Sequence, residues 1–204
     1  MTSGLITFSD AGGGGAATAL TSISGPISEI KSLLALKSTT APGINGIEDA
    51  PVILDAGSYS AADLVFIDGA TTGNVNASAA TSIVGQMADV TAVLDAADDA
   101  AGGDNHTIDF GNGAATALEN VTITDVTITA TELTNLLGDN TTNDGPLTRG
   151  TITLLSSSIT GSYAEILDVS HTKPAALAAA SLPAVVGLSS QNFTITGTPS
   201  SANV

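Results

Sequence analysis

The 204-residue sequence contains no cysteine and no tryptophan, and aromatic residues make up only 3% of it. Without cysteine, the chain can form no disulfide bond and can offer no thiolate ligand to a metal ion. Because large aromatic side chains are so scarce, we expect a core built in thin layers from small and branched aliphatic residues. Hydrophobic residues still make up 43% of the chain, which is enough for one ordinary domain or for several small repeats.

Basic residues are also scarce. The chain has four lysines and arginines against 20 acidic residues, for a formal net charge of −16. Binding to nucleic acid or to an anionic membrane surface depends on clustered basic side chains, so both are poor partners for this chain. The acidity favours solubility in a salty medium, and the alternative interpretation is the binding of divalent cations.

Long hydrophobic runs are missing as well. The start, MTSGLITFSD, has neither a basic segment nor a long apolar run, so it does not predict a cleaved secretion signal. The most apolar late stretch, AALAAASLPAVVG (175–187), is too short for a membrane-spanning helix and is interrupted by Pro183. We therefore expect a soluble protein without membrane insertion.

Three stretches share one pattern of apolar residues and little else: TSISGPISEIKSLL, TSIVGQMADVTAVL and SSITGSYAEILDVS, aligned on Gly25, Gly85 and Gly161. Each predicts a short strand, a glycine turn and an amphipathic helix, because the apolar residues after the glycine recur at helical spacing. Pro26 is expected at the first helical position. The apolar positions are Ile23, Ile83 and Ile159, then Ile27, Met87 and Tyr163, then Ile30, Val90 and Ile166, and finally Leu33, Val93 and Val169.

A second unit alternates with the first. SAADLVFIDGATTG (60–73) resembles TATELTNLLGDNTTNDG (129–145), and Ser60 with Asp63, like Thr129 with Glu132, has the spacing of a helix capping box. The predicted buried stripes of these helices are Leu64 with Ile67 and Leu133 with Leu136. Further strands are predicted in APVILDAG (50–57), ENVTITDVTI (119–128), LITFSD (5–10) and NFTITG (192–197).

These patterns predict an α/β repeat fold, a solenoid-like stack of strand–turn–short-helix units with parallel strands. The competing fold is a compact β-rich sandwich with short helices. We expect one repeat domain over 1–204, with approximate units 1–73, 74–145 and 146–204. The glycine spacing grows from 60 residues (Gly25 to Gly85) to 76 (Gly85 to Gly161), and the extra residues are attributed mainly to a polar insertion loop, DDAAGGDNHTIDFGNGAA (98–115).

An acidic residue stands four positions after each repeated glycine: Glu29, Asp89 and Glu165. Each stands alone in its own repeat, so a catalytic role is disfavoured. A carboxylate in the first turn of a helix is stabilised by the unpaired N–H groups and the helix dipole. We therefore interpret these three acids as structural.

The insertion loop gathers oxygen-bearing side chains that could bind calcium, which takes six to eight oxygen ligands. The candidate ligands are Asp98, Asp99, Asp104 and Asp109, beside Asn105 and His106. The spacing is not that of an EF-hand and lacks the nonapeptide pattern of calcium-binding β-rolls. An exposed acidic loop is therefore the favoured interpretation, and the same holds for GDNTTNDG (138–145).

No catalytic or cofactor-binding pattern is recognisable. His106 and His171 lie in different units without a second ligand at metal-binding spacing, and no G-x-S-x-G sequence is present. DAGGGGAA (10–17) lacks the lysine and the following Ser or Thr of a phosphate-binding loop. A carbohydrate-active enzyme would need paired carboxylates and aromatic platforms, and the chain has two tyrosines and four phenylalanines. We expect no enzymatic activity.

Residues 61–96, AADLVFIDGATTGNVNASAATSIVGQMADVTAVLDA, resemble the repeats of very large marine cyanobacterial cell-surface proteins. Similar repeats are expected in structural proteins of the phages that infect those bacteria. The repeats carry phrases of the type L-x-x-L-D-x-x-T-T-G-x-V-x-A-S, followed by I-x-G-x-x-A-D-V. The matching residues are Leu64, Ile67, Asp68, Thr71, Thr72, Gly73, Val75, Ala77, Ser78, Ile83, Gly85, Ala88, Asp89 and Val90.

The resemblance implies a non-enzymatic surface or assembly role. Our first hypothesis is a virion component of a marine cyanophage, such as a capsid decoration, knob or appendage subunit. The alternative is a secreted cell-surface or filament-forming protein of a marine cyanobacterium. In either case we expect self-association, or docking on other structural proteins, through the exposed edges of the repeats.

Overall fold

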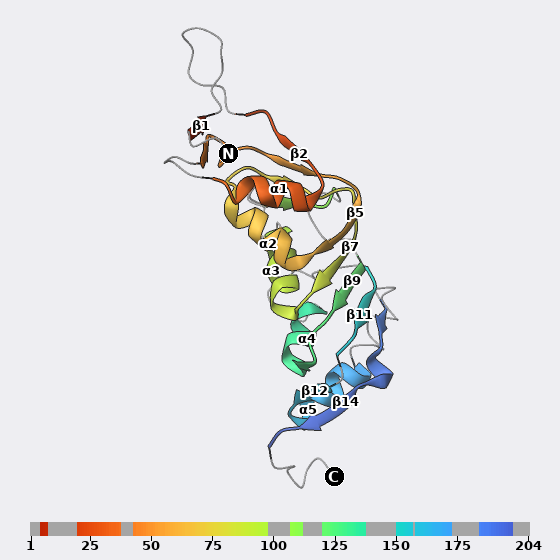
Figure 1. Ribbon diagram of the computed structural model, residues 1–204. Helices are drawn as coiled ribbons and strands as arrows, with labels where there is room; N and C mark the ends of the chain where they lie inside the picture. The colour runs from red at the N-terminus through yellow and green to blue at the C-terminus, as the bar shows by residue number, and fades with distance from the viewer. Residues whose placement is uncertain are drawn as a thin grey trace.

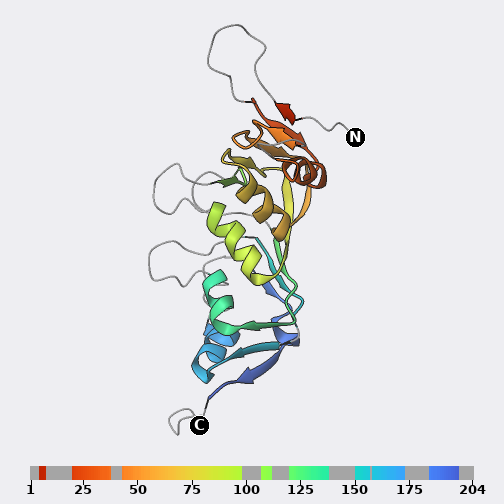
Figure 2. The same cartoon turned by 60° about the vertical axis from the view of Figure 1, so that its left-hand side comes forward.

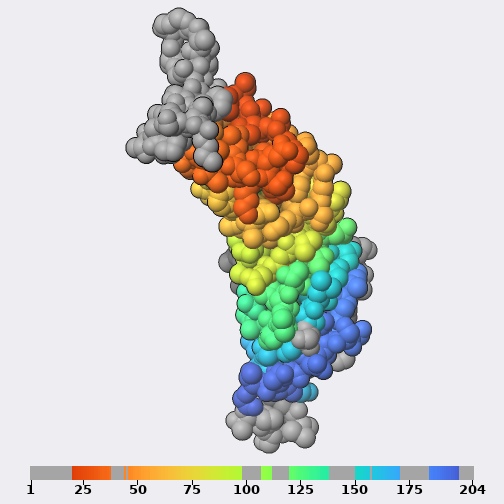
Figure 3. Space-filling model, viewed as in Figure 1, coloured from red at the N-terminus to blue at the C-terminus, as the bar shows by residue number. Residues whose placement is uncertain are grey.

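The computed structural model describes residues 5–7, 20–37, 43–97, 107–111, 120–137, 150–156, 158–172 and 184–197. The molecule is elongated, and its elements follow one another from end to end in chain order (Figures 1 and 3). The helices are α1 (Ile27–Leu34), α2 (Ala61–Ala70), α3 (Met87–Ala97), α4 (Ala130–Leu136), α5 (Tyr163–Leu167), the π-helix η1 (Asp168–Thr172) and the 3-10 helix η2 (Leu188–Ser190).

The strands are short and form four parallel sheets among the described residues. The first sheet pairs β1 (Leu5–Thr7) with β3 (Gly43–Asn45). The second runs β2 (Ile23–Gly25), β4 (Val52–Leu54), β6 (Val75–Asn76) and β8 (Ile108–Asp109). The third runs β5 (Gly57–Ser60), β7 (Ala80–Gly85), β9 (Asn120–Ile123), β11 (Ile152–Leu154) and β13 (Val185–Val186). The fourth runs β10 (Thr127–Thr129), β12 (Ser158–Gly161) and β14 (Asn192–Ile195).

Helices α2, α3 and α4 follow one another along one side of the molecule, beside the strands (Figure 2). We use the word unit for one of the helices α1 to α5 together with the strands that precede it in the sequence, for example β4, β5 and α2. Strands β13 and β14 form the last unit. Within the second, third and fourth sheets, each strand pairs with strands of neighbouring units. The prediction of an α/β protein with parallel strands and short helices is confirmed.

The strand register aligns apolar side chains in columns that run from unit to unit. Most of these residues are β-branched, and they are buried except toward the C-terminal end. Burying one such side chain stabilises the fold by about 1.5–3 kcal/mol. The columns are Ile23–Val52–Val75–Ile108, Tyr59–Ile83–Val121–Ile152–Val185 and Ile128–Ile159–Phe193.

Backbone hydrogen bonds accompany the columns. The backbone N–H groups of Val52, Val75 and Val121 donate to the backbone carbonyls of Asn74, Thr107 and Thr151, respectively, at 2.9, 2.7 and 2.8 Å. Each acceptor lies directly before the partner strand in the next unit. The same residues therefore supply both the apolar contact and the hydrogen bond that join adjacent units.

The predicted strands, glycine turns and helices are confirmed around Gly25, Gly85 and Gly161. Ile23, Ile83 and Ile159 are buried in β2, β7 and β12, and a helix begins two residues after each repeated glycine. Leu64, Ile67, Leu133 and Leu136 are buried as predicted. The three isoleucines nevertheless belong to three different sheets, because Ile23 pairs with Val52 and Ile83 pairs with Val121. The spacing seen in the sequence therefore covers two structural units.

Some side-chain predictions were wrong. Tyr163 is exposed on α5, and Leu33 is only half-buried because the neighbouring Leu34 takes the core position. Pro26 is the N-cap of α1 rather than its first helical residue; its extended backbone (ψ 140°) precedes the helix, and its carbonyl accepts from Ile30. Residues 107–111 are not a polar loop, because they contain β8 with Ile108 and Phe110 buried.

Gly85 and Gly161 occupy equivalent contacts between units. A Cβ on Gly85 would lie 2.7 Å from the Ala61 Cβ, and one on Gly161 would lie 2.9 Å from the Ala130 Cβ. Ala61 and Ala130 are the first residues of α2 and α4, and both are fully buried. Close approach of each unit to the helix of the preceding unit thus explains why both positions are glycine.

The Thr-Thr-Gly turn after α2 binds the preceding unit in a similar way. The Thr71 hydroxyl donates to the Ala50 carbonyl at 2.8 Å, and the Thr72 hydroxyl donates to the Asp49 carboxylate at 2.7 Å. A Cβ on Gly73 would lie 2.6 Å from the Ala50 backbone, which excludes any larger residue. Several residues that carry the sequence resemblance therefore join units together.

We predict that Gly85→Ala destabilises the protein by about 1–3 kcal/mol, because the added methyl group overpacks the contact with Ala61. The matched control is Gly69→Ala in α2, where an added Cβ has no neighbour within 4 Å. It should stabilise the protein by roughly 0.5–1 kcal/mol through helix propensity. Chemical denaturation measures both. Equal effects of the two substitutions would contradict the close-packed contact.

Candidate functional site

The third column ends at an exposed position on the last strand. Phe193 of β14 is in register with Ile159, which is fully buried, yet Phe193 is 39% exposed. Ile195, two residues further along the same face, is 47% exposed. Because side chains alternate across a strand, Phe193 and Ile195 lie on the face that is core-facing in β12. The last described strand therefore presents core-type residues that no other described unit covers.

The backbone of β14 is also incompletely paired, because it is the edge strand of its sheet among the described residues. The Thr196 N–H donates to the Gly161 carbonyl at 2.8 Å. N–H and C=O groups alternate between the two sides of a strand. The backbone groups of Thr194 therefore face β12, and those of Phe193 and Ile195 face the open side.

Helix α5 extends this apolar region. Tyr163 and Leu167 lie one turn apart on α5, which contacts β14, and both are exposed. We call this set, together with Phe193 and Ile195, the C-terminal end surface. These elements lie at one end of the molecule (Figure 1).

The starts of the first two columns differ from the end of the third. Ile23 and Tyr59 are the first residues of their columns, and they are only 8% and 4% exposed. The first side chains of these columns are therefore covered, whereas Phe193 at the end of its column is exposed, although β2 and β5 are also edge strands among the described residues.

A buried polar pair holds the entry to β14. The Ser156 hydroxyl donates to the Gln191 side-chain oxygen at 3.1 Å, and the Gln191 side-chain nitrogen donates to the Gly187 carbonyl at 2.9 Å. Gly187 has φ +90°, and a Cβ there would lie 2.6 Å from the Leu154 oxygen. The last strand is thus fixed on the preceding unit, although its outer edge is open.

Helix α5 is held by a capping box that the sequence analysis did not identify. The Ser162 N–H donates to the Glu165 carboxylate at 2.7 Å, and the Ser162 hydroxyl accepts from the Glu165 N–H. The Thr131 hydroxyl of α4 donates to the same carboxylate at 2.9 Å. These hydrogen bonds lower the pKa of Glu165, since they stabilise its ionised form.

The predicted capping boxes had mixed outcomes. The box of Thr129 with Glu132 is present in α4. The box of Ser60 with Asp63 is absent, and Asp63 instead forms an ion pair with Lys31 of α1. Asp63 is shorter than glutamate by one methylene and is drawn to the neighbouring helix. The interpretation of Glu29, Asp89 and Glu165 as first-turn acids agrees with their positions in α1, α3 and α5.

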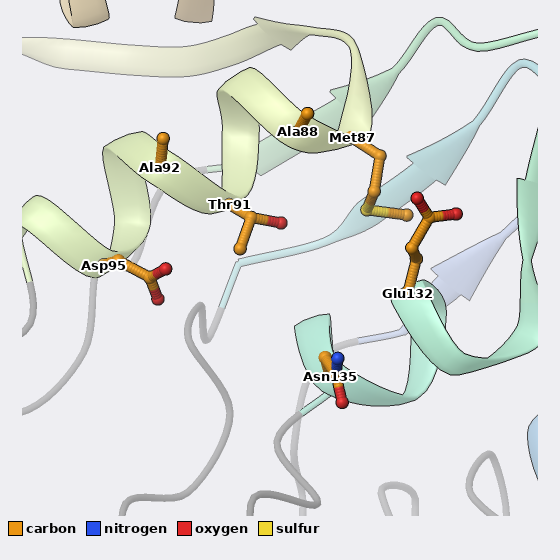
Figure 4. Close-up of a pocket in the computed structure, with 7 residues that line it drawn as sticks. All are labelled: Met87, Ala88, Thr91, Ala92, Asp95, Glu132 and Asn135. Atoms are coloured by element: carbon orange, nitrogen blue, oxygen red, sulfur yellow. The ribbon is translucent and has the colours of Figure 1, made fainter.

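A pocket of about 300 Å³ lies between α3 and α4 (Figure 4). In this region the Met87 N–H at the start of α3 donates to the Asp125 carboxylate of the next unit at 2.6 Å. Burial raises the pKa of Asp95. Asp95 and Glu132 lie at opposite ends of the pocket, and Glu132 is already engaged by its capping box (Figure 4). The lining residues are Met87, Ala88, Thr91, Ala92, Asp95, Glu132 and Asn135.

The candidate calcium ligands are not brought together by the described residues. Asp98, Asp99 and Asp104 lie outside the described part of the chain, as does His106. Asp109 lies in β8, where its carboxylate accepts from the Gly111 N–H at 2.6 Å. Within the described ranges no group of three His, Cys, Asp or Glu side chains could hold a metal ion.

Comparisons of the chain with protein-family models, with curated proteins and with solved structures found no significant match. None of the described helices is long and apolar enough to cross a membrane.

We predict that the contribution of Glu165 to stability depends on pH. Its lowered pKa means that the stabilisation is fully present above the ordinary value of 4.5 and is lost as the pH falls through the folded-state value. The difference in unfolding free energy between the wild type and Glu165→Gln should therefore shrink as the pH falls through the folded-state pKa of Glu165. Thr131→Val removes only one of the hydrogen bonds and should show a smaller change in denaturation experiments. A difference that stays constant with pH would contradict this role.

Proposed function

We propose that the chain is a non-enzymatic structural protein, a solenoid-like stack of strand–helix units that assembles through an end of the stack. The observation that carries this proposal is the C-terminal end surface, where a buried column finishes in the exposed Phe193 on a strand edge that no described strand pairs. Natural proteins usually cover or interrupt such edges, because exposed strands pair readily with other strands. Terminal repeats of a stack are likewise expected to be capped.

The resemblance of residues 61–96 to repeats of marine cyanobacterial surface proteins supports the biological setting. Within this proposal the chain is a virion component of a marine cyanophage, serving as a capsid decoration, knob or appendage subunit. The alternative setting is the surface or a filament of a marine cyanobacterium. In both settings the chain serves as a building block of a larger assembly, and neither setting requires enzymatic activity.

Assembly is tested by sedimentation of the purified chain over a wide concentration range. We predict association at high concentration, because the C-terminal end surface contains four exposed large side chains. The solvent-exposed variant Leu155→Lys is the matched control, since Leu155 is 64% exposed and lies outside that surface. A monodisperse monomer at every concentration, with no attachment to particles, would contradict the proposed function.

The setting is tested by immunogold electron microscopy with antibodies raised against the chain. The proposal predicts gold labelling at regular positions on purified phage particles. Labelling of washed cell envelopes or culture filaments without phage would replace the virion setting by the cell-surface one.

A further inference from the structure

We infer that the partner of β14 is the β14 strand of a second copy, paired antiparallel across a two-fold axis at Thr194. This inference rests on the proposed assembly function and names its interface. It follows from the strand edge that no described strand pairs, from the positions of its apolar residues, and from the exposure of Phe193 compared with the buried first residues of the other columns.

The side chains of β14 are self-complementary in this register. With Thr194 on the axis, Phe193 lies opposite Ile195 of the second copy, and Ile195 lies opposite Phe193. Directly opposite residues of an antiparallel pair lie on the same face, and aromatic pairs with β-branched residues are favourable. Both apolar residues lie on the face that is buried in the preceding strands. Each copy therefore covers the exposed end of the other copy's column.

The backbone agrees independently with the same register. The Thr196 N–H bonds to Gly161, so the N–H and C=O groups of Phe193 and Ile195 face outward. In an antiparallel pair, alternate residue pairs exchange two hydrogen bonds. The register centred on Thr194 makes Phe193 and Ile195 those hydrogen-bonded pairs. A register shifted by one residue would place Phe193 opposite a polar position.

A second copy also fits better than a head-to-tail stack. In a head-to-tail arrangement, β14 would meet a strand at the start of a column in the next molecule, such as β2 or β5, where Ile23 and Tyr59 are already buried. The isologous arrangement instead joins two surfaces that are both open, and it closes at a dimer. It joins two three-stranded sheets into one continuous sheet across the axis. Tyr163 and Leu167 of α5 lie beside this strand and extend the apolar contact.

The absence of cysteine allows a direct test by single-cysteine cross-linking. Thr194→Cys places two thiols opposite each other at the axis, in a non-hydrogen-bonded pair with Cα atoms about 4.5 Å apart, which is within disulfide range. Asn192→Cys is the matched control, because its two copies would be separated by about 14 Å along the strands. Mild oxidation followed by gel electrophoresis should yield a covalent dimer from Thr194→Cys and not from Asn192→Cys.

A second variant tests the edge hydrogen bonds without disturbing the fold. Ile195→Pro removes an outward-facing N–H, and proline is tolerated at such positions of edge strands. It should weaken dimerisation about thirtyfold or more, because two hydrogen bonds are lost across the two-fold axis. Circular dichroism should show an unchanged fold, and Leu155→Lys should leave the dimer intact.

The outcomes separate this inference from the proposed function. A selective disulfide at position 194 together with a dimer weakened by Ile195→Pro supports it. Cross-linking that is equal at positions 192 and 194, or oligomers that grow without limit, overturns the two-fold interface and leaves assembly itself standing. A chain that stays monomeric and attaches to no particle overturns both.

Discussion

The parallel register of the short strands is the constraint on which the rest of the structure depends. It places Ile83, Val121 and Ile152 in one line, so that each unit buries an apolar residue against the same type of residue in its neighbours. A strand of three or four residues cannot bury its apolar face alone. The units therefore stabilise one another, and the last unit is left with a face that nothing on the described chain covers.

Close approach between units accounts for the small residues at their contacts. Gly85 meets Ala61 and Gly161 meets Ala130 in nearly the same way, since a Cβ on either glycine would lie only 2.7 or 2.9 Å from the alanine Cβ. These contacts let the end of a strand lie against the start of the preceding helix. The scarcity of aromatic residues fits the same geometry, because the space between successive units holds side chains of moderate size.

The local elements could be predicted from the sequence, whereas the partners of the strands could not. Helical spacing around Gly25, Gly85 and Gly161 locates the strands and helices because it depends only on neighbouring residues. Strand pairing depends on how much chain lies between units, and this varies too much for a simple period. Ile83 pairs with Val121 rather than with a sequence-equivalent isoleucine because the spacing between the repeated glycines covers two structural units.

The candidate site could be foreseen only in outline. NFTITG was predicted as a strand, but its exposed position depends on β14 being the last strand of its sheet. The cap that Asp125 supplies to α3 joins residues far apart in the sequence, and no local motif indicates it. Asp63 is the opposite case, in which a local motif is present but does not form. It has the spacing of a capping box with Ser60, yet its carboxylate pairs with Lys31 of the neighbouring helix.

Residue-resolved hydrogen exchange tests the central claim that in-register columns hold the units together. The N–H groups of Val75, Val121 and Ile152 donate to neighbouring units, so we predict that they exchange slowly and at similar rates, as parts of one cooperative core. Fast exchange of these amides, or widely different rates from unit to unit, would show that the units fold separately and would contradict the claim.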